Sequence, residues 1–207
     1  MQLQNYYYWF KDAIPHHVCD DIVRYAKSIQ DQMAVTGAYG NKKLNKKEVQ
    51  DLKKKRDSDI IWLNERWIYN AIHPFIHQAN KDANWNFQWD FSESCQFTKY
   101  KKGQYYDWHC DSWDKPYDSP NTSSHGKQRK LSVTLSLSND KEYKGGELEF
   151  DMRNMDPDKK ANTHVLKEIR SKGSLVVFPS DVWHRVKPVK SGVRHSLVIW
   201  NLGWPFK

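Results

Sequence analysis

The chain has 207 residues, with ten tryptophans and eleven tyrosines, which predicts one aromatic-rich domain spanning residues 1–207. Its net charge of +8 would suit an acidic partner such as nucleic acid. The three cysteines form no Cys-x-x-Cys pair, which argues against a disulfide framework or a zinc knuckle, and no apolar run approaches the roughly 20 residues of a membrane-spanning helix. We therefore expect a cytoplasmic protein with reduced thiols and no membrane partner.

The first 85 residues predict a helical buttress for a core that follows. Apolar residues at helical spacing after Pro15 predict a helix that runs to about Gln32. A second set with the same spacing predicts a helix over residues 67–79, which Pro74 should kink or break in two.

Between these two helices the sequence predicts a basic loop and a short strand. Residues 41–57 hold seven lysines and one arginine with few apolar residues, which favours a solvated segment, either a lid over an active site or a surface for a partner. Asp59–Leu63 has the apolar run of a short strand. Residues 114–130, rich in Pro, Ser and Asn, are a second candidate lid.

Residues 86–207 predict a mainly β core. Its clearest strand is Leu131–Ser138, where leucines and a valine face one way and serines and a threonine the other. The first face belongs to a core, and the second can line a cavity. Short strands at this spacing, with turn signals between them, are typical of a sandwich or barrel of the jelly-roll kind.

The stretch Tyr100–Asp111 ends in a histidine and a carboxylate two residues apart. In an extended strand His109 and Asp111 point to one face and Cys110 to the other. Two such ligands can hold a divalent metal if a third arrives from elsewhere. A lone His-x-Asp pair is a weak signal, because such pairs also occur by chance.

His184 is the candidate third ligand. We expect Val182–Val186 and Val193–Trp200 to form a hairpin, which would place His184 beside the face that carries Arg194 and Ser196 and turn His195 away. Taken singly, His184 could be a core histidine and Arg194 a surface residue. Two histidines and one carboxylate, however, leave three coordination positions open, as in non-haem Fe(II) oxygenases, and an arginine can hold a carboxylate with two hydrogen bonds.

Several motifs occur in an order that matches a known family. They are Tyr100-x-x-Gly103-x-x-Tyr106-x-x-His109-x-Asp111, then Gly145-Gly146-Glu147-Leu148, then Phe178-Pro179-Ser180, and finally His184-Arg185-Val186-x-Pro188 through Arg194. This set, over about residues 95–203, resembles the 2-oxoglutarate and Fe(II)-dependent oxygenases of the prolyl 4-hydroxylase type, including the PKHD-type hydroxylases of bacteria and phages.

The resemblance implies a double-stranded β-helix, which is a distorted jelly roll, with His109, Asp111 and His184 holding Fe(II). It implies that Arg194 binds the distal carboxylate of 2-oxoglutarate, that Tyr100 or Ser196 adds a hydrogen bond there, and that ascorbate is a further ligand. The implied reaction couples oxidative decarboxylation of 2-oxoglutarate, to succinate and carbon dioxide, with hydroxylation of a prolyl residue in a peptide or protein.

Three alternatives stay open beside the prolyl substrate. The same chemistry could act on a nucleic-acid base, which the charge of +8 would suit, or on a small molecule. The third alternative is a jelly-roll module that binds a ligand without catalysis. Such a module would need neither the set of His109, Asp111 and His184 nor Arg194. The aromatic residues Tyr106, Trp108, Trp113 and Trp183 could form a substrate wall for a proline ring or a nucleobase, or simply pack.

Overall fold

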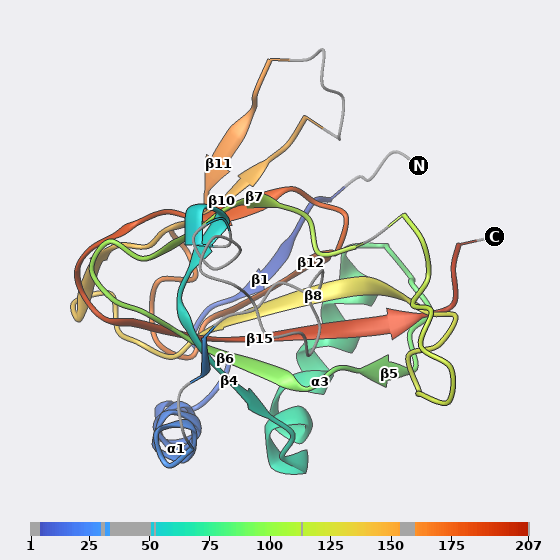
Figure 1. Ribbon diagram of the computed structural model, residues 1–207, viewed down its shortest axis with the longest axis horizontal. Coiled ribbons are helices and arrows are strands. Elements are labelled where there is room, and N and C mark those ends of the chain that lie inside the picture. Colours follow the sequence, from blue (N-terminus) through green and yellow to red (C-terminus); the bar gives the residue numbers. More distant parts are fainter. Residues whose placement is uncertain are drawn as a thin grey trace.

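The computed structural model describes residues 5–29, 32–33, 51, 53–112, 114–153 and 160–206. Its strands form two large antiparallel sheets and one small one, and the helices lie on the side of the larger sheet that faces away from β7 and β10 (Figure 1). The expectation of a mainly β protein with N-terminal helices is therefore confirmed. In the part of the chain described, no helix is long and apolar enough to cross a membrane.

The strands of both sheets come from distant parts of the chain. The eight-stranded sheet has the order β1 (Tyr8–Phe10), β12 (Leu175–Pro179), β8 (Gln128–Ser136), β15 (Arg194–Gly203), β6 (Cys95–Tyr100), β4 (Asp59–Leu63) and β2 (Gln32–Met33), with β5 (Phe91–Ser92) paired to β15. The five-stranded sheet has the order β11 (Thr163–Val165), β10 (Leu148–Asp151), β13 (His184–Val186), β7 (Tyr105–His109) and β3 (Arg56–Asp57). The small sheet pairs β14 (Val189–Gly192) with β9 (Tyr143–Gly145).

Both predicted helices are present, with corrections. Helix α1 (His16–Lys27) follows Pro15 as expected but ends before Gln32, because the Ser28 hydroxyl donates to the Tyr25 carbonyl at 2.7 Å and closes the last turn. Helix α3 (Arg66–Asp82) continues through Pro74, so the expected break in two was wrong.

The packing of α3 explains why Pro74 does not break it. A proline inside a helix costs about 3 kcal/mol. Ile68, Ile72, Ile76 and Ala79 are completely buried on one face of the helix, and each isoleucine contributes about 1.5–3 kcal/mol by leaving water. Burial of this face therefore outweighs the hydrogen bond that Pro74 cannot make.

The expected hairpin of Val182–Val186 with Val193–Trp200 was wrong. Strand β13 pairs with β10 and β7, whereas β15 lies in the other sheet between β8 and β6. The predicted turn at residues 190–192 belongs to β14, which pairs with β9. There Gly192 has a φ of +75°, and a Cβ would clash with the Glu142 carbonyl. The apolar alternation of both strands was real, but alternation does not specify the partner strand.

Two apolar clusters fill the molecule. The first packs α1 and α3 against the outer face of the eight-stranded sheet, and Leu131, Val133 and Leu135 of β8 belong to it. The second lies between the sheets and contains Tyr100, Phe150 and Phe178 among others. The serines and threonine that alternate along β8 are also buried, on the side away from the helices. The prediction of one core face and one polar face on this strand is confirmed.

The basic segment is only partly described. Residues 41–50 lie outside the described residues, residues 53–55 are helical, and Arg56–Asp57 forms β3 beside β7. Arg56 does not fit the expectation of a solvated loop, since it is only 6% exposed. Its Nε donates to the Ser58 hydroxyl at 3.0 Å and its Nη1 to the side-chain amide oxygen Oε1 of Gln96 at 3.2 Å, and these bonds satisfy much of the buried guanidinium.

The second candidate lid is a loop up to Gln128, where β8 begins. The Tyr117 hydroxyl ties this loop to Glu93 at 3.0 Å. The backbone N–H of Gly126 donates to the Tyr117 carbonyl at 2.9 Å, and the Lys127 ammonium pairs with Asp90 at 2.8 Å. The loop is therefore attached to the segment that leads into β6.

Candidate metal centre

The structure brings His109, Asp111 and His184 together, with one ligand atom of each within 4.8 Å of the others. His109 ends β7 and His184 begins β13, and the two residues face each other across the sheet. The Nε2 atoms of His109 and His184 lie 3.8 Å and 3.6 Å from the two carboxylate oxygens of Asp111. The three predicted ligands thus converge on one point. No other group of this kind occurs among the residues that the structure describes.

The route by which Asp111 reaches this point differs from the prediction. Strand β7 ends at His109, so Asp111 does not share a regular strand face with it. Instead, the Asp111 backbone N–H donates to the Ser180 carbonyl at 2.8 Å, which pulls the chain out of the sheet. The Ser132 hydroxyl then donates to the Asp111 carboxylate at 2.8 Å and holds it. Cys110 lies outside the ligand group, as expected.

A register shift in β7 also shapes the site. His184 faces His109, but Val186 faces Tyr106, so β7 carries one extra residue across this interval. Such a bulge re-aims the side chains next to it. Here Tyr106 and His109, three residues apart, stack with ring centroids 3.5 Å apart. Tyr106 therefore lies beside the candidate metal position.

Backbone carbonyls orient both histidine rings. The Nδ1 of His109 lies 2.7 Å from the Asp107 carbonyl oxygen, and the Nδ1 of His184 lies 2.9 Å from that of Val182. A neutral imidazole that donates from Nδ1 has its lone pair on Nε2. Hydrogen bonds of this kind fix the tautomer and the ring orientation of metal-binding histidines. Both Nε2 lone pairs are therefore available on the side of Asp111.

The charges at the site suit a divalent cation. Burial, with the proximity of His184, lowers the pKa of His109 to about 3, so this imidazole is neutral at pH 7. Burial alone would raise the pKa of Asp111, but His184, His109, Arg129 and the Ser132 hydroxyl lower it below its usual range. Two histidines and one carboxylate are the donor set of non-haem Fe(II) centres. The residues present fit Fe(II).

Arg194 lies on the inner face of β15 and is 3% exposed. Its Nη1 donates to the Ser196 hydroxyl at 3.0 Å, and its guanidinium lies 5.5 Å from the centre of the Tyr100 ring. Tyr100 belongs to the same apolar cluster as Phe178, whose ring lies 4.8 Å from that of His184. One cluster therefore connects the predicted carboxylate anchor to the metal ligands.

Two neighbours of Arg194 agree with the sequence analysis. Gly146, in the Gly-Gly-Glu motif, has a φ of +63°, and a Cβ there would lie 3.0 Å from Arg194 Cδ. A side chain at this position would therefore strain the backbone and crowd the arginine. His195 faces the other way, as predicted, and stacks on Phe97 of the outer cluster at 5.5 Å.

Sequence reasoning missed Arg56 as a site residue. Its guanidinium lies 4.6 Å from the centre of the Tyr106 ring, and the His109 ring also stacks on Tyr106. Arg56 Nη2 is buried and has no hydrogen-bond partner in the part of the chain that the structure describes. Arg56 follows three lysines in a basic segment, so nothing in the sequence distinguished it from the other charged residues there.

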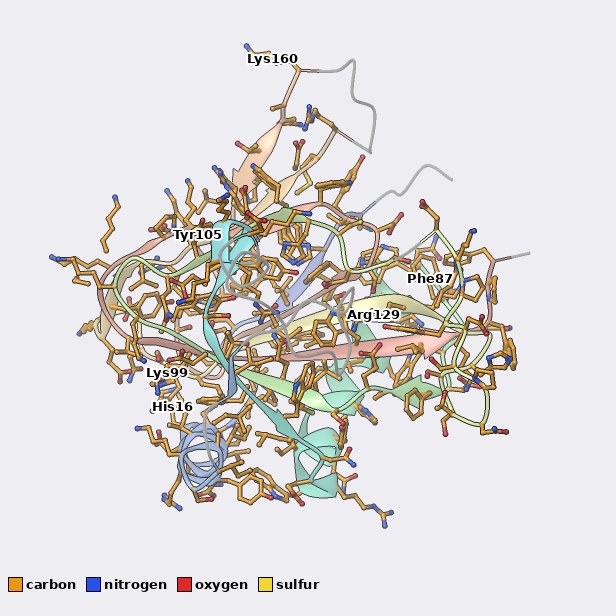
Figure 2. All side chains as sticks on the ribbon, viewed as in Figure 1. His16, Phe87, Lys99, Tyr105, Arg129 and Lys160 are labelled. Carbon is orange, nitrogen blue, oxygen red and sulfur yellow. The ribbon has the colours of Figure 1, made fainter. Side chains whose placement is uncertain are left out.

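Arg129 and Glu93 were missed as well. Two nitrogens of Arg129 donate to the two carboxylate oxygens of Glu93 at 2.8 Å and 2.6 Å, and its guanidinium lies 3.9 Å from the centre of a Trp200 ring. Figure 2 shows Arg129 within the body of the molecule, whereas Lys160 projects into solvent just before β11. The indole N–H of Trp200 is buried and lacks a partner within the described residues. The only signal in the sequence was an arginine two residues before Leu131, the start of the clearest predicted strand.

Of the predicted aromatic wall, Tyr106 lies at the site. The position of Trp108 is explained by packing within the protein. The Trp108 ring packs under the Arg185 guanidinium at 4.6 Å, and Arg185 in turn pairs with Glu149 at 2.6 Å. Trp183, next to His184, is 38% exposed. Trp113 lies outside the residues that the structure describes.

Comparison with known proteins supports this site. The sequence profile of the 2OG-Fe(II) oxygenase superfamily matches residues 95–201, which include every predicted site residue. A PKHD-type hydroxylase of Synechococcus sp. (strain CC9902) is 38% identical over 99 residues, which are 47% of this chain and 36% of that protein. A PKHD-type hydroxylase of Pseudoalteromonas atlantica is 34% identical over 107 residues, 51% of this chain and 41% of that protein. The match thus spans well under half the length of these relatives.

Solved structures show the same fold over nearly the whole chain. A Pseudomonas putida prolyl-4-hydroxylase superimposes with a TM-score of 0.65 at 18% identity, covering 96% of this chain and 92% of that one. A prolyl hydroxylase from Trichoplax adhaerens, in complex with a hypoxia inducible factor peptide fragment, gives 0.66 at 17% identity, covering 96% and 84%. A viral collagen prolyl hydroxylase from Paramecium Bursaria Chlorella virus-1, in complex with 2OG, gives 0.63 at 19%, covering 97% of both chains. The jelly-roll fold expected from the sequence is thereby confirmed.

Proposed function

The chain belongs to the 2OG-Fe(II) oxygenase superfamily, whose members use Fe(II) and 2-oxoglutarate, and from this premise we propose that it is a hydroxylase with His109, Asp111 and His184 as its iron ligands. The observation that carries the proposal is the convergence of two histidine Nε2 atoms on the Asp111 carboxylate. A jelly-roll module that only binds would have no use for this buried donor set. Iron with 2-oxoglutarate and dioxygen supplies oxidative decarboxylation coupled to C–H hydroxylation.

We assign Arg194 to the distal carboxylate of 2-oxoglutarate. Its guanidinium is buried and faces no carboxylate partner within the described residues, since the hydrogen bond from Nη1 goes to the Ser196 hydroxyl. A buried cation is costly without a counter-charge. A ligand carboxylate would supply that charge and could accept two parallel hydrogen bonds. Ser196 then positions the guanidinium, and Tyr100 forms the surface beneath it.

For the prime substrate we propose a prolyl residue in a peptide or protein. Arg56 Nη2 and Trp200 Nε1 are buried donors that lack partners within the described residues. An unmade buried hydrogen bond costs about 1–3 kcal/mol, and peptide carbonyls would satisfy both donors. Tyr106, which stacks on His109, is a partly exposed aromatic residue beside the candidate metal position, and a proline ring can pack against it. The peptide bound to the Trichoplax adhaerens enzyme supports this choice by analogy of fold.

The oxygenase proposal is tested with labelled 2-oxoglutarate. We expect the protein with Fe(II) and oxygen to release carbon dioxide slowly without a prime substrate, and His109→Ala to abolish that release. His77→Ala is the matched control, because His77 is exposed on α3, outside the site, and should retain full release. Absence of release by the unmodified protein under all conditions would refute the proposal.

The substrate is tested by mass spectrometry. Proline-containing peptides and single-stranded oligonucleotides are offered in parallel, because the net charge of +8 makes nucleic acid the comparison substrate. We expect a gain of one oxygen on proline in the peptides. A gain on the oligonucleotides alone would replace the prolyl substrate with a base and would leave the iron site unaffected.

A further inference from the structure

A groove of about 540 Å³ lies outside the metal site, beside strand β1. Its lining residues are Asn5, Tyr6, Tyr7, Tyr8, Trp9 and Met152. Strand β1 ends the order of the eight-stranded sheet and pairs only with β12. The lining contains four aromatic residues and no charged one, in a chain whose net charge is +8.

Two aromatic residues of the groove, Tyr7 and Tyr8, are held in place by contacts with neighbouring elements. The Tyr7 ring stacks on Phe150 of β10, with centroids 5.4 Å apart, and on His164 of β11 at 5.8 Å. The Tyr8 hydroxyl donates to the Asp82 carboxylate at 3.2 Å. This anchoring fixes one wall of the groove across the gap between the two large sheets.

Other donors of the groove are free. Trp9 is 39% exposed. Within the described residues, the Trp9 indole N–H and the hydroxyls of Tyr6 and Tyr7 make no hydrogen bond. Flat aromatic faces with donors at their edges can bind a chain that offers carbonyl oxygens and apolar rings.

Met152 of the groove is connected through the backbone to the segment that carries His184. Met152 follows Asp151, whose backbone N–H donates to the Trp183 carbonyl at 2.9 Å. Trp183 is exposed and directly precedes His184. A polypeptide that reacts at the metal could therefore extend past Trp183 and Met152 into the groove.

We infer that this groove docks an extended, proline-rich stretch of the polypeptide substrate, at a distance from the residue that reacts. The inference rests on the proposed prolyl hydroxylase function. A polyproline II helix makes no internal hydrogen bonds, so its carbonyls remain free for the Tyr6 and Trp9 donors, and its rings pack on aromatic faces. A polyanion is disfavoured, because the lining offers no cation to neutralise phosphates.

A direct binding test needs no activity. Isothermal titration calorimetry of the full chain with a poly-L-proline peptide should show binding, and Trp9→Ala and Tyr6→Ala should each weaken it about tenfold, as expected for an aromatic anchor. Trp67→Ala is the matched control, because Trp67 is 40% exposed on α3 and does not line this groove. It should bind like the unmodified protein. Two variants are used so that the test survives if one of them fails to fold.

A kinetic test separates docking from chemistry. Trp9→Ala should raise the KM for a long proline-rich polypeptide about tenfold, while kcat, the KM for a short single-proline peptide and uncoupled 2-oxoglutarate turnover stay unchanged. Unchanged poly-L-proline binding in both groove variants would overturn the inference. So would a loss of self-association in those variants, because the groove would then hold a second copy. Binding that depends on Trp9, with no turnover of any prolyl substrate, would support the groove and refute the proposed function.

Discussion

The two faces of the eight-stranded sheet differ in what they bury. On the outer face, Leu197 and Ile199 of β15 pack into the apolar cluster beneath α1 and α3. On the inner face of the same strand, Arg194 and Ser196 are buried with a hydrogen bond between them. Alternation along one strand thus separates the residues that stabilise the fold from those proposed to bind 2-oxoglutarate.

The inner face buries more polar groups. Trp200 Nε1 on β15, and Arg56 Nη2 on β3 of the opposite sheet, are buried without partners in the described part of the chain, and each unmade hydrogen bond costs about 1–3 kcal/mol. The outer face buries mostly apolar side chains, which gain from leaving water. His195, stacked on Phe97, is a polar exception whose Nε2 also lacks a partner within the described residues. Substitutions on the two faces should therefore have opposite consequences, and the predictions below test this contrast.

The largest effect is expected at the metal ligand. Asp111→Asn removes the only anionic ligand, so 2-oxoglutarate decarboxylation should fall by more than about 100-fold, beyond the range seen for residues that merely support a ligand. The melting temperature of the metal-free protein should change little, because Ser132 can still donate to the amide oxygen. Activity assays and thermal unfolding of the same samples measure both quantities. Substantial activity would remove Asp111 from the ligand set.

On the outer face, Leu197→Ala should do the reverse. The side chain is completely buried, so its truncation should lower the free energy of unfolding by about 2–5 kcal/mol. Activity per folded molecule, measured well below the melting temperature, should stay within about twofold. Chemical denaturation measures the first quantity. A selective loss of activity without destabilisation would contradict the separation of the two faces.

Ser132→Ala tests a residue that supports a ligand from the inner face. Losing the hydrogen bond to the Asp111 carboxylate should weaken Fe(II) binding about 10- to 100-fold, the usual effect of removing such a partner. Metal titration followed by activity recovery measures it. The neighbouring Val133→Ala, on the outer face of the same strand, is the control and should destabilise the protein without changing Fe(II) affinity.

The smallest effect concerns pH. Burial lowers the pKa of His195 to about 4, so the folded state prefers the neutral ring. Between pH 6.5 and about 4 the unfolded chain binds a proton that the folded chain does not, and stability is lost as the pH falls through this range. His195→Phe should reduce the loss between pH 7 and pH 5 by up to about 2 kcal/mol. Denaturation at both pH values measures it, and an unchanged loss would show that His195 is not responsible.

Residue alternation predicted the two faces well. The spacing of Leu131 and Ser132 assigned them to opposite sides of β8, and the ligand triad followed from residue types that suit iron. Partner strands were harder, because alternation fits any neighbour, and β13 and β15 therefore ended in different sheets. Arg56 was missed because its burial depends on Ser58 and Gln96, a contact between β3 and the opposite sheet that local spacing does not reveal.

Because backbone carbonyls orient the two histidines, the site should respond differently to substitutions than to insertions or deletions. Every residue carries a backbone carbonyl, so exchanging Asp107 or Val182 for another residue leaves the acceptors of the His109 and His184 Nδ1 atoms in place. Inserting or deleting one residue just before either histidine would instead turn its ring away from Asp111. At these positions the site should tolerate changes of identity and reject changes of length.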